Sequence, residues 1–469
     1  MQSRFTTSIA LALLGLLGLL AGCSSRVPLG AIYSEPAQRL ADQRTPVIVI
    51  PGVLGSKLED GLTGQKVWGS FTFGAADTDL PEGAREAALP MREGVPLREL
   101  RDQVEAVDVL DTLEVDLGPL RGIQLAAYVD ILETLAVGKY RDASLGRAGA
   151  VDYGGRHYTC FQYPYDWRRD IAEQAGGLAR LIREAQQAAR EEQGLAADAP
   201  VKVDVVAHSM GGLVLRYYLR YGTAALPEDG SLPEITWAGA ADVRLAILVG
   251  TPNLGATGAL RQLVEGWDLN PFFPNYRASV LGTMPSIYQL LPRSGAAVVD
   301  AWGKPLALYD PATWEHYQWG LLDPRQAEYL SWLLPDETPQ ARRRIAADQI
   351  RKSLARAEQF HRAIDVPASP PAGTEIFLFA GDEHLTETVV RVRSDGELEQ
   401  WGEEAGDGSV ARYSALGDLR WGQPWQAWLR TPVAWQRVQF LDGDHQFLTN
   451  GTDFADNLLY LLMERPPPR

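Results

Sequence analysis

The sequence of 469 residues predicts an α/β fold built on a mostly parallel β-sheet with helices on both faces. Short apolar runs rich in Val, Ile and Leu recur along the chain, and helical segments separate them. This arrangement is typical of strands that are buried on both faces of a sheet. The hydrophobic fraction of 46% and the charged fraction of 22% are ordinary for a globular protein. A chain of this length can bury a large core.

Five apolar runs are predicted to be strands, each bounded by Gly, Pro or polar residues. In chain order they are residues 45–52, 201–206, 243–250, 375–380 and 438–441. A segment from about Ile171 to Gln193, rich in Ala, Leu, Arg and Glu, is predicted to be a helix before the second strand. A further helix, from Phe454 to Met463, is expected to close the domain.

Two long stretches interrupt this alternation, at about residues 56–155 and 256–373. Both are predicted to be insertions between strands of one domain that covers residues 45–465. Each suits either extra structural packing or a cap over an active site for apolar substrates. The second stretch contains five tryptophans, which favours the cap there. They are Trp267, Trp302, Trp314, Trp319 and Trp332.

Residues 1–22 are predicted to be a lipoprotein signal peptide. Arg4 supplies a positive charge, and the apolar run that follows is too short to span a bilayer comfortably but suits a signal-peptide core. The run ends in Leu-Ala-Gly-Cys, which resembles the lipobox of bacterial lipoproteins. This resemblance implies cleavage before Cys23 and acylation of that cysteine.

Acylation of Cys23 would anchor the chain in a membrane, since each buried methylene adds about 0.8 kcal/mol. Residues 23–44 are predicted to be the tether. By resemblance to lipoprotein sorting, Ser24 in place of Asp favours the outer membrane, with the domain facing the periplasm or the surface. The formal net charge of −16 argues against nucleic acid as a partner and against attachment to anionic lipid by net charge.

Cys160 is the second of two cysteines, so no internal disulfide is possible if Cys23 is acylated. Its apolar and aromatic neighbours predict a buried core thiol rather than a reactive one. No cofactor and no metal site are predicted. Asp442 and Asp444 beside His445 fit a turn better than a set of metal ligands.

Residues 207–211, Ala-His-Ser-Met-Gly, match a nucleophile elbow, in which a serine occupies the tight turn between a strand and a helix. The pattern alone is weak, because about one chance match is expected in a chain so rich in Ser, Gly and Ala. An apolar strand before it and a helical run after it make it specific. We therefore predict an α/β-hydrolase fold with Ser209 as the nucleophile. His208 is not expected to be the base, because it points elsewhere from the elbow.

A serine nucleophile needs a base, and the base needs an acid that orients it. On this fold the chain order is Ser, acid, His. His445 follows the last predicted strand directly and is predicted to be the base, whereas His316 and His361 suit surface or packing roles. The acid is either Asp382, directly after the fourth strand, or Asp407, between two glycines in a tight loop.

Several segments together resemble the lecithin:cholesterol acyltransferase family, which includes phospholipid:diacylglycerol acyltransferases and lysosomal phospholipase A2. The strings Pro-Gly-Val-Leu-Gly-Ser-Lys-Leu-Glu and Pro-Tyr-Asp-Trp-Arg are specific, and the order of the segments is that of the family. The resemblance spans about residues 46–448 and is patchy in both insertions. The segments are residues 46–59, 163–168, 207–211, 251–255 and 406–410, together with His445.

The resemblance implies that Asp407, in a Gly-Asp-Gly-Ser-Val motif, is the acid in preference to Asp382. It also implies an oxyanion hole formed by the backbone N–H groups of Val53 and Met210. Ala207 stands where the family has Gly, and both residues are small. The cysteine pair that pins the lid in animal members is missing here, so a lid must be held differently.

These residues predict a serine-dependent lipid acyl hydrolase or O-acyltransferase that acts on phospholipid or other lipid esters through an acyl-enzyme at Ser209. The acyl group would pass to water, or to an alcohol or sterol acceptor if the capped site excludes water. One alternative is an esterase or lipase on non-phospholipid esters without transferase activity. Another is a non-catalytic lipoprotein of the same fold. The expected partners are a lipid substrate and a membrane.

Overall fold

The computed structural model describes residues 28–39, 44–71, 76–110, 112–117, 120–126, 128–155, 157–268 and 275–465. The predicted signal peptide, the predicted lipidation site Cys23 and the first residues of the predicted tether lie outside the described residues. Within the described ranges, no helix is both long enough and apolar enough to cross a membrane.

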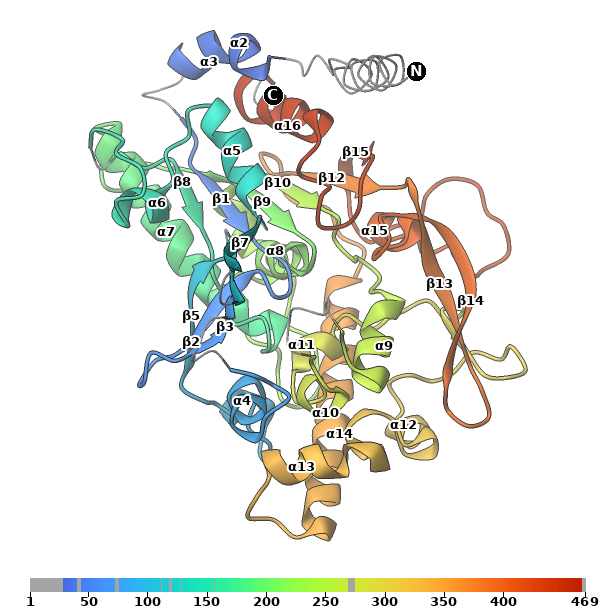
Figure 1. Ribbon diagram of the computed structural model, residues 1–469. Helices are drawn as coiled ribbons and strands as arrows, with labels where there is room; N and C mark the ends of the chain where they lie inside the picture. Colours follow the sequence, from blue (N-terminus) through green and yellow to red (C-terminus); the bar gives the residue numbers. More distant parts are fainter. Residues whose placement is uncertain are drawn as a thin grey trace, which may run out of the picture.

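A six-stranded sheet forms the centre of the molecule, and all its neighbouring strands are parallel (Figure 1). It consists of β1 (Val47–Ile50), β8 (Cys160–Gln162), β9 (Val203–His208), β10 (Val243–Val249), β12 (Glu375–Gly381) and β15 (Trp435–Leu441). The strands stand in the order β15-β12-β10-β9-β1-β8. This sheet confirms the predicted α/β class and contains all five predicted strands, to which β8 adds a sixth at one edge.

Each face of the sheet buries its own hydrophobic core. One face is covered by α7 (Gln174–Glu192), α8 (Met210–Tyr221) and α14 (Pro339–Ile364), and the other by α3 (Ser34–Arg39), α5 (Val129–Val137) and α16 (Thr452–Leu459). Neighbouring strand residues point to opposite faces, so Val205 belongs to the first core and Val206 to the second. Because both faces are buried there, β1, β9, β10 and β12 are largely apolar rather than alternating, whereas the edge strand β15 is mostly exposed or half-buried.

The residues between β1 and β8 form the first insertion, which builds two small sheets next to the carboxyl end of β1 (Figure 1). Its last helices, α5 and α6, precede β8, and α5 covers the central sheet. This stretch therefore contributes to the body of the domain as well as to the site. Its other elements are β2 (Ser56–Asp60), β3 (Lys66–Trp68), β4 (Ser70–Phe71), α4 (Pro81–Ala87), β5 (Val104–Val109), β6 (Thr112–Leu117), β7 (Leu120–Ala126) and α6 (Ala143–Arg147).

The residues between β10 and β12 form the second insertion, whose last helix also belongs to the body. The Phe360 ring of α14 stacks on Tyr217 of α8 with centroids 6.0 Å apart, and Arg216 donates to the Ile364 carbonyl at 2.6 Å. Only the part before α14 can therefore act as a cap. That part contains α9 (Thr257–Glu265), α10 (Ala278–Leu281), α11 (Pro285–Tyr288), β11 (Val298–Val299), α12 (Pro311–Tyr317) and α13 (Ala327–Leu333).

A third excursion, which the sequence pattern did not predict, separates β12 from β15. Its strands β13 (His384–Val392) and β14 (Leu398–Gly406) form an antiparallel hairpin, and β11 pairs with β13. The helix α15 (Arg412–Leu416) and a long loop then lead to β15. The two candidate acids, Asp382 and Asp407, flank this hairpin in the sequence and lie at its open end, where His384 pairs with Gly406.

Part of the predicted tether is folded onto the domain. The helices α2 (Leu29–Ile32) and α3 lie beside α16 at one end of the molecule (Figure 1). Tyr33 and Ala37, one helical turn apart, are buried in the second core. The Tyr33 hydroxyl donates to the Asp456 carboxylate at 2.7 Å. Burial of these two apolar positions explains why the segment packs instead of forming a loose leader.

Candidate active site

Ser209, His445 and Asp407 come together at the carboxyl ends of the central strands. Ser209 Oγ lies 2.9 Å from His445 Nε2, and His445 Nδ1 lies 2.8 Å from Asp407 Oδ2. Ser209 follows β9, Asp407 follows β14 and His445 follows β15. The contacts have the geometry of a nucleophile, its base and the acid that orients the base.

Asp407, not Asp382, holds its carboxylate against the His445 ring. The amides of Ser409 and Val410 donate to Asp407 Oδ1 at 3.0 and 2.6 Å, and the Asp407 carbonyl accepts from the His445 amide at 2.8 Å. Burial raises the pKa of Asp407, but the nearby His445 and these hydrogen bonds outweigh it, so the pKa is lowered. The carboxylate is therefore ionised at neutral pH.

The contact with Asp407 also changes the pKa of His445. Burial lowers the pKa of the imidazole, but the charge of Asp407 and the hydrogen bond to it outweigh that effect, so the pKa is raised above its usual value. A raised pKa makes His445 a stronger base toward the Ser209 proton.

A strained turn between β9 and α8 presents the serine. Ser209 has φ 53° and ψ −126°, a conformation that is costly for a residue with a Cβ atom. Gly211 allows the close approach of this turn to β1, because an added Cβ would lie 2.4 Å from the Pro51 carbonyl oxygen. Ala207 pairs with Ile50 inside the sheet, where its small side chain is fully buried.

Of the two predicted oxyanion residues, Met210 follows Ser209 in the chain, and Val53 lines the same cavity as Ser209. Val53 lies in the turn after β1 and lines the cavity next to the serine. Met210 begins α8 with its side chain buried, and the first amides of a helix have no acceptor within the helix. Gly52 lets the two turns meet, because a Cβ added there would lie 2.8 Å from Ser209 Cβ.

The Pro-Tyr-Asp-Trp-Arg string braces the turn after β1. The Tyr165 hydroxyl donates to the Pro51 carbonyl at 2.9 Å, and the Tyr165 amide donates to the Ser56 hydroxyl at 3.0 Å. Arg168, which is fully buried, donates from two nitrogens to the Asp166 carboxylate at 2.9 Å. This string therefore positions the backbone that carries Val53 rather than touching the site itself.

Tyr128 and His208 are site residues that sequence reasoning missed. The Gly52 amide donates to Tyr128 Oη at 2.7 Å, and Tyr128 Oη lies 3.2 Å from His208 Nδ1. His208 Nε2 lies 3.0 Å from the His445 carbonyl oxygen. Burial, followed by the proximity of His445, lowers the pKa of His208 to about 3, so the ring is neutral. A proton on Nε2 satisfies both contacts, because Nδ1 then accepts from Tyr128 and Nε2 donates to His445.

This Tyr128–His208 relay joins the turn after β1 to the loop that carries His445. His208 could be seen in the sequence as the neighbour of the nucleophile. Its contact with Tyr128, which lies 80 residues earlier, could not be predicted from the sequence. Such a contact depends on how the first insertion folds back over the sheet.

Ser209 and His445 open into a cavity of about 670 Å³. The cavity lies within the usual range for ligand pockets. Aromatic side chains line it, namely Trp68 of the first insertion, Trp267 of the second insertion and Phe447 of the loop after β15. Its wall is therefore largely apolar, as an acyl chain requires.

One ion pair interrupts the apolar wall. Arg261 Nε and Nη2 lie 3.0 and 2.7 Å from the two carboxylate oxygens of Glu387. Both residues line the cavity and join α9 of the second insertion to β13. This bidentate pair fixes two walls of the cavity relative to each other.

The five tryptophans of the second insertion lie in different environments. Trp267 lines the cavity, whereas Trp314 and Trp319 are buried and meet edge to face with centroids 5.6 Å apart. Trp332 packs on the core from α13, and Trp302 is almost fully exposed. Within this stretch, cavity lining and core packing are therefore roles of different tryptophans.

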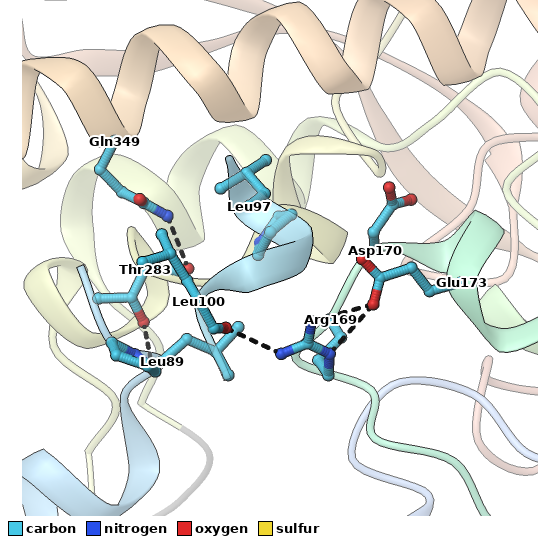
Figure 2. A pocket seen from close by; sticks show the side chains of 10 residues that line it. Leu89, Leu97, Leu100, Arg169, Asp170, Glu173, Thr283 and Gln349 are labelled. Carbon is cyan, nitrogen blue, oxygen red and sulfur yellow. Dashed lines mark hydrogen bonds and ion pairs between the residues drawn. The ribbon is translucent and has the colours of Figure 1, made fainter. Parts of the chain in front are cut away.

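A second hollow, of about 10 Å³, lies outside the catalytic cavity, and Figure 2 shows the residues that line it. That volume has room for about one water molecule. The Leu89 amide donates to Thr283 Oγ1 at 2.9 Å, Gln349 donates to the Thr283 carbonyl at 3.1 Å, and Arg169 donates to the Leu100 carbonyl at 3.1 Å. The hollow is thus a hydrogen-bonded joint between the two insertions.

Within the residues that the structure describes, no group of three or more His, Cys, Asp and Glu side chains could hold a metal ion. Cys160 is buried and unpaired, which confirms the predicted core thiol. Its burial raises the pKa of the thiol.

The parallel sheet and the elbow serine define an α/β-hydrolase fold. Residues 148–316 match the model of the lecithin:cholesterol acyltransferase family. This match agrees with the resemblance of the sequence motifs to that family and covers part of the segment over which they occur.

Solved structures are similar to this chain at low sequence identity. The crystal structure of the Tle4–Tli4 complex matches with a TM-score of 0.55 and 16% identity, over 90% of this chain and 98% of that chain. Bacillus licheniformis lipase BlEst2 in its propeptide form gives 0.34 and 11%, over 91% of this chain and 52% of that chain. EstA from Clostridium botulinum gives 0.32 and 12%, over 91% and 89%. A comparison with curated protein sequences found no match.

Proposed function

We propose that the protein is a serine-dependent lipid acyl hydrolase or O-acyltransferase that forms an acyl-enzyme at Ser209. The observation that carries this proposal is the hydrogen-bonded series Ser209–His445–Asp407 at the floor of a largely apolar cavity of about 670 Å³. A neutral ring-nitrogen acceptor 2.9 Å from a serine hydroxyl is what activation of that hydroxyl requires.

In the first half of the reaction, Ser209 Oγ attacks the ester carbonyl carbon while His445 Nε2 takes the hydroxyl proton. Asp407 stabilises the imidazolium that results. The oxyanion is held by the amides of Val53 and Met210, and loss of one such donor typically costs about 2.7–4 kcal/mol. His445 then returns its proton to the departing alcohol, which leaves the acyl group on Ser209.

In the second half, water or an alcohol attacks the acyl-enzyme, and His445 takes the proton of the attacking hydroxyl. Collapse of the intermediate releases the acyl product and returns the proton to Ser209 Oγ. Water gives a free fatty acid, whereas a sterol or long-chain alcohol gives a new ester. The outcome depends on whether the cavity binds the alcohol and excludes water.

The family match and the aromatic lining of the cavity support a lipid ester as the acyl donor. Phospholipid is the donor we favour, because the chain resembles a family that acts on phospholipid. We further propose that acylated Cys23 anchors the protein in the outer membrane, which would keep the enzyme at a lipid surface.

The test mixes the protein with vesicles that contain acyl-labelled phosphatidylcholine and a sterol or long-chain alcohol. Labelled fatty acid alone indicates a phospholipase, and labelled new ester indicates an acyltransferase. Both products should vanish in Ser209→Ala and persist in the matched variant Ser286→Ala, a buried serine outside the cavity. Product formation by Ser209→Ala at the parent rate would overturn the proposal.

A fluorophosphonate probe separates an enzyme from a non-catalytic lipoprotein of the same fold. The probe reacts only with an activated serine, so we expect it to label the parent protein and not Ser209→Ala. Absence of labelling in the parent would favour the non-catalytic alternative.

A further inference from the structure

Residues 419–430, here called the tryptophan loop, connect α15 to β15 on the side of the molecule that carries the β13–β14 hairpin (Figure 1). Trp425 is 89% exposed and Trp428 is 86% exposed. Leu419 and Leu429 of the same loop are also exposed. Tryptophan is highly buried on average, so two nearly bare indole rings in one short loop call for an external partner.

The loop is held in one conformation. The Leu419 amide donates to the Arg430 carbonyl at 2.8 Å, which closes the loop at its base. The Trp421 ring stacks on Tyr413 with centroids 4.1 Å apart and an angle of 11° between the rings. Trp428 has φ 65°, a left-handed conformation that is strained for a bulky residue. Strain of this kind persists at functional positions, where the surrounding contacts enforce it.

The charge of this segment is opposite to that of the whole chain. No Asp or Glu occurs from residue 419 to residue 441, whereas Arg420, Arg430 and Arg437 do, in a chain of net charge −16. Arg420 is neutralised by Asp418, with Nε 2.8 Å from Oδ1. Arg430 and Arg437 are exposed. The tryptophan loop therefore combines apolar rings with positive charge.

We propose that the tryptophan loop docks on the surface of a lipid bilayer that carries anionic headgroups. Trp425 and Trp428 would enter the interface, where amphipathic indole rings are preferred, and Arg430 and Arg437 would contact the headgroups. A bilayer fits the loop better than an acidic protein, since the rings stand out from the surface instead of lining a groove. This inference rests on the proposed action of the enzyme on lipid esters.

The base of the loop packs on segments that also line the catalytic cavity. Trp421 packs on a small cluster that includes Leu254 and Ala411. Pro252 and Val410, within two residues of these, line the cavity. Docking of the loop would therefore hold a lipid surface on the side of the molecule where Pro252 and Val410 form part of the cavity wall.

Tryptophan quenching by brominated lipid tests the docking directly. The full chain is reconstituted in phosphatidylcholine vesicles with and without phosphatidylglycerol. Brominated acyl chains are supplied either in those vesicles or in vesicles added afterwards, so that contact with either surface is detected. The difference in emission between the parent and Trp425→Phe/Trp428→Phe isolates the two loop rings. Trp302→Phe, another nearly bare tryptophan outside the loop, is the matched control.

We expect the parent and Trp302→Phe to show strong quenching that phosphatidylglycerol increases and salt decreases, and Trp425→Phe/Trp428→Phe to lose most of it. Arg430→Gln should weaken the dependence on phosphatidylglycerol. Equal quenching in the parent and the double variant, an equal loss in Trp302→Phe, or no dependence on anionic lipid would overturn the proposal.

Ser209→Ala separates a failure of this inference from a failure of the proposed function. We expect the variant to lose ester turnover and to keep the quenching of the parent. Turnover that does not depend on Ser209 would overturn the proposed function and leave the docking result standing. Quenching that does not depend on Trp425 and Trp428 would overturn the docking and leave the catalytic residues standing.

Discussion

The protonation of His445 is decided by a single neighbouring charge. Asp407 raises the pKa of the imidazole against the effect of burial, and its own pKa is lowered in return. Attack by Ser209 requires the neutral imidazole, so activity should increase with pH as His445 loses its proton. The position of that increase reports the charge on Asp407.

Replacing Asp407 with Asn should lower kcat by about 10⁴-fold and shift the pH profile of the remaining activity to lower pH, because the His445 pKa falls. The measurement is kcat against pH on a soluble ester. Asp382→Asn is the matched control and should behave like the parent. A comparable loss of kcat in Asp382→Asn would contradict the assignment of Asp407.

Tyr128→Phe should slow turnover without weakening substrate binding. The substitution keeps the ring but removes the hydroxyl that contacts the Gly52 amide and His208. One hydrogen bond is worth about 1 kcal/mol, so kcat should fall by roughly tenfold or less while KM stays constant. Tyr163→Phe removes a hydroxyl that donates to the Gln174 carbonyl instead, and it should leave kcat unchanged. An increase in KM alone would argue against a positioning role.

At the scale of elements, the sequence pattern was informative where strands are buried on both faces. The runs that became β1, β9, β10 and β12 were visible for that reason, whereas β15 is an edge strand that was predicted only over residues 438–441. β8 was not predicted because it has only three residues. β13 was not predicted because Thr, Glu and Arg occur in a strand with one partly exposed face. The hairpin β13–β14 explains why the acid lies so far after β12.

Arg168 ties two elements together inside the protein. It is fully buried and contacts Asp166 of its own string and Asp102 of the first insertion, each at 2.9 Å. Removing one partner of a buried ion pair leaves the other charges unpaired, so Arg168→Leu should lower the free energy of unfolding by about 3–5 kcal/mol. Chemical denaturation measures this change.

The control for Arg168 is an arginine on the surface. Arg325 pairs with Asp323 at 2.8 Å while its side chain is 80% exposed. Arg325→Leu should change the free energy of unfolding by less than about 1 kcal/mol. If the two variants were equally stable, the ion pairs of Arg168 next to the turn after β1 would contribute little to folding stability.

At the scale of the whole molecule, the site is assembled from segments far apart in sequence. The positions of Ser209 and His445 could be predicted because each follows a predicted strand in a known order, and the family motif selected Asp407 over Asp382. The relay through Tyr128 and the tryptophan loop could not be predicted in this way. They depend on how the insertions fold over the sheet, which local periodicity does not encode.

Acid should destabilise the folded protein through His208. Its pKa is about 3 in the folded protein against an ordinary value of 6.5, so the unfolded chain binds an extra proton between these pH values. The contribution to stability is complete above about pH 6.5 and decreases as the pH falls toward 3, by up to about 1.4 kcal/mol per pH unit. Denaturant titrations at several pH values should give a smaller slope in His208→Asn than in the parent. Identical slopes would mean that the pKa of His208 is not lowered by folding.

The strained turn at Ser209 also has a thermodynamic consequence for the resting enzyme. A left-handed residue with a side chain costs roughly 1–3 kcal/mol of folding free energy, whether or not substrate is bound. Glycine usually makes a chain less stable than alanine, but here Ser209→Gly relieves the strain that Ser209→Ala retains. Of these two inactive variants, the glycine variant should therefore unfold at the higher denaturant concentration. The native serine would then be a position where catalysis is maintained at the expense of stability.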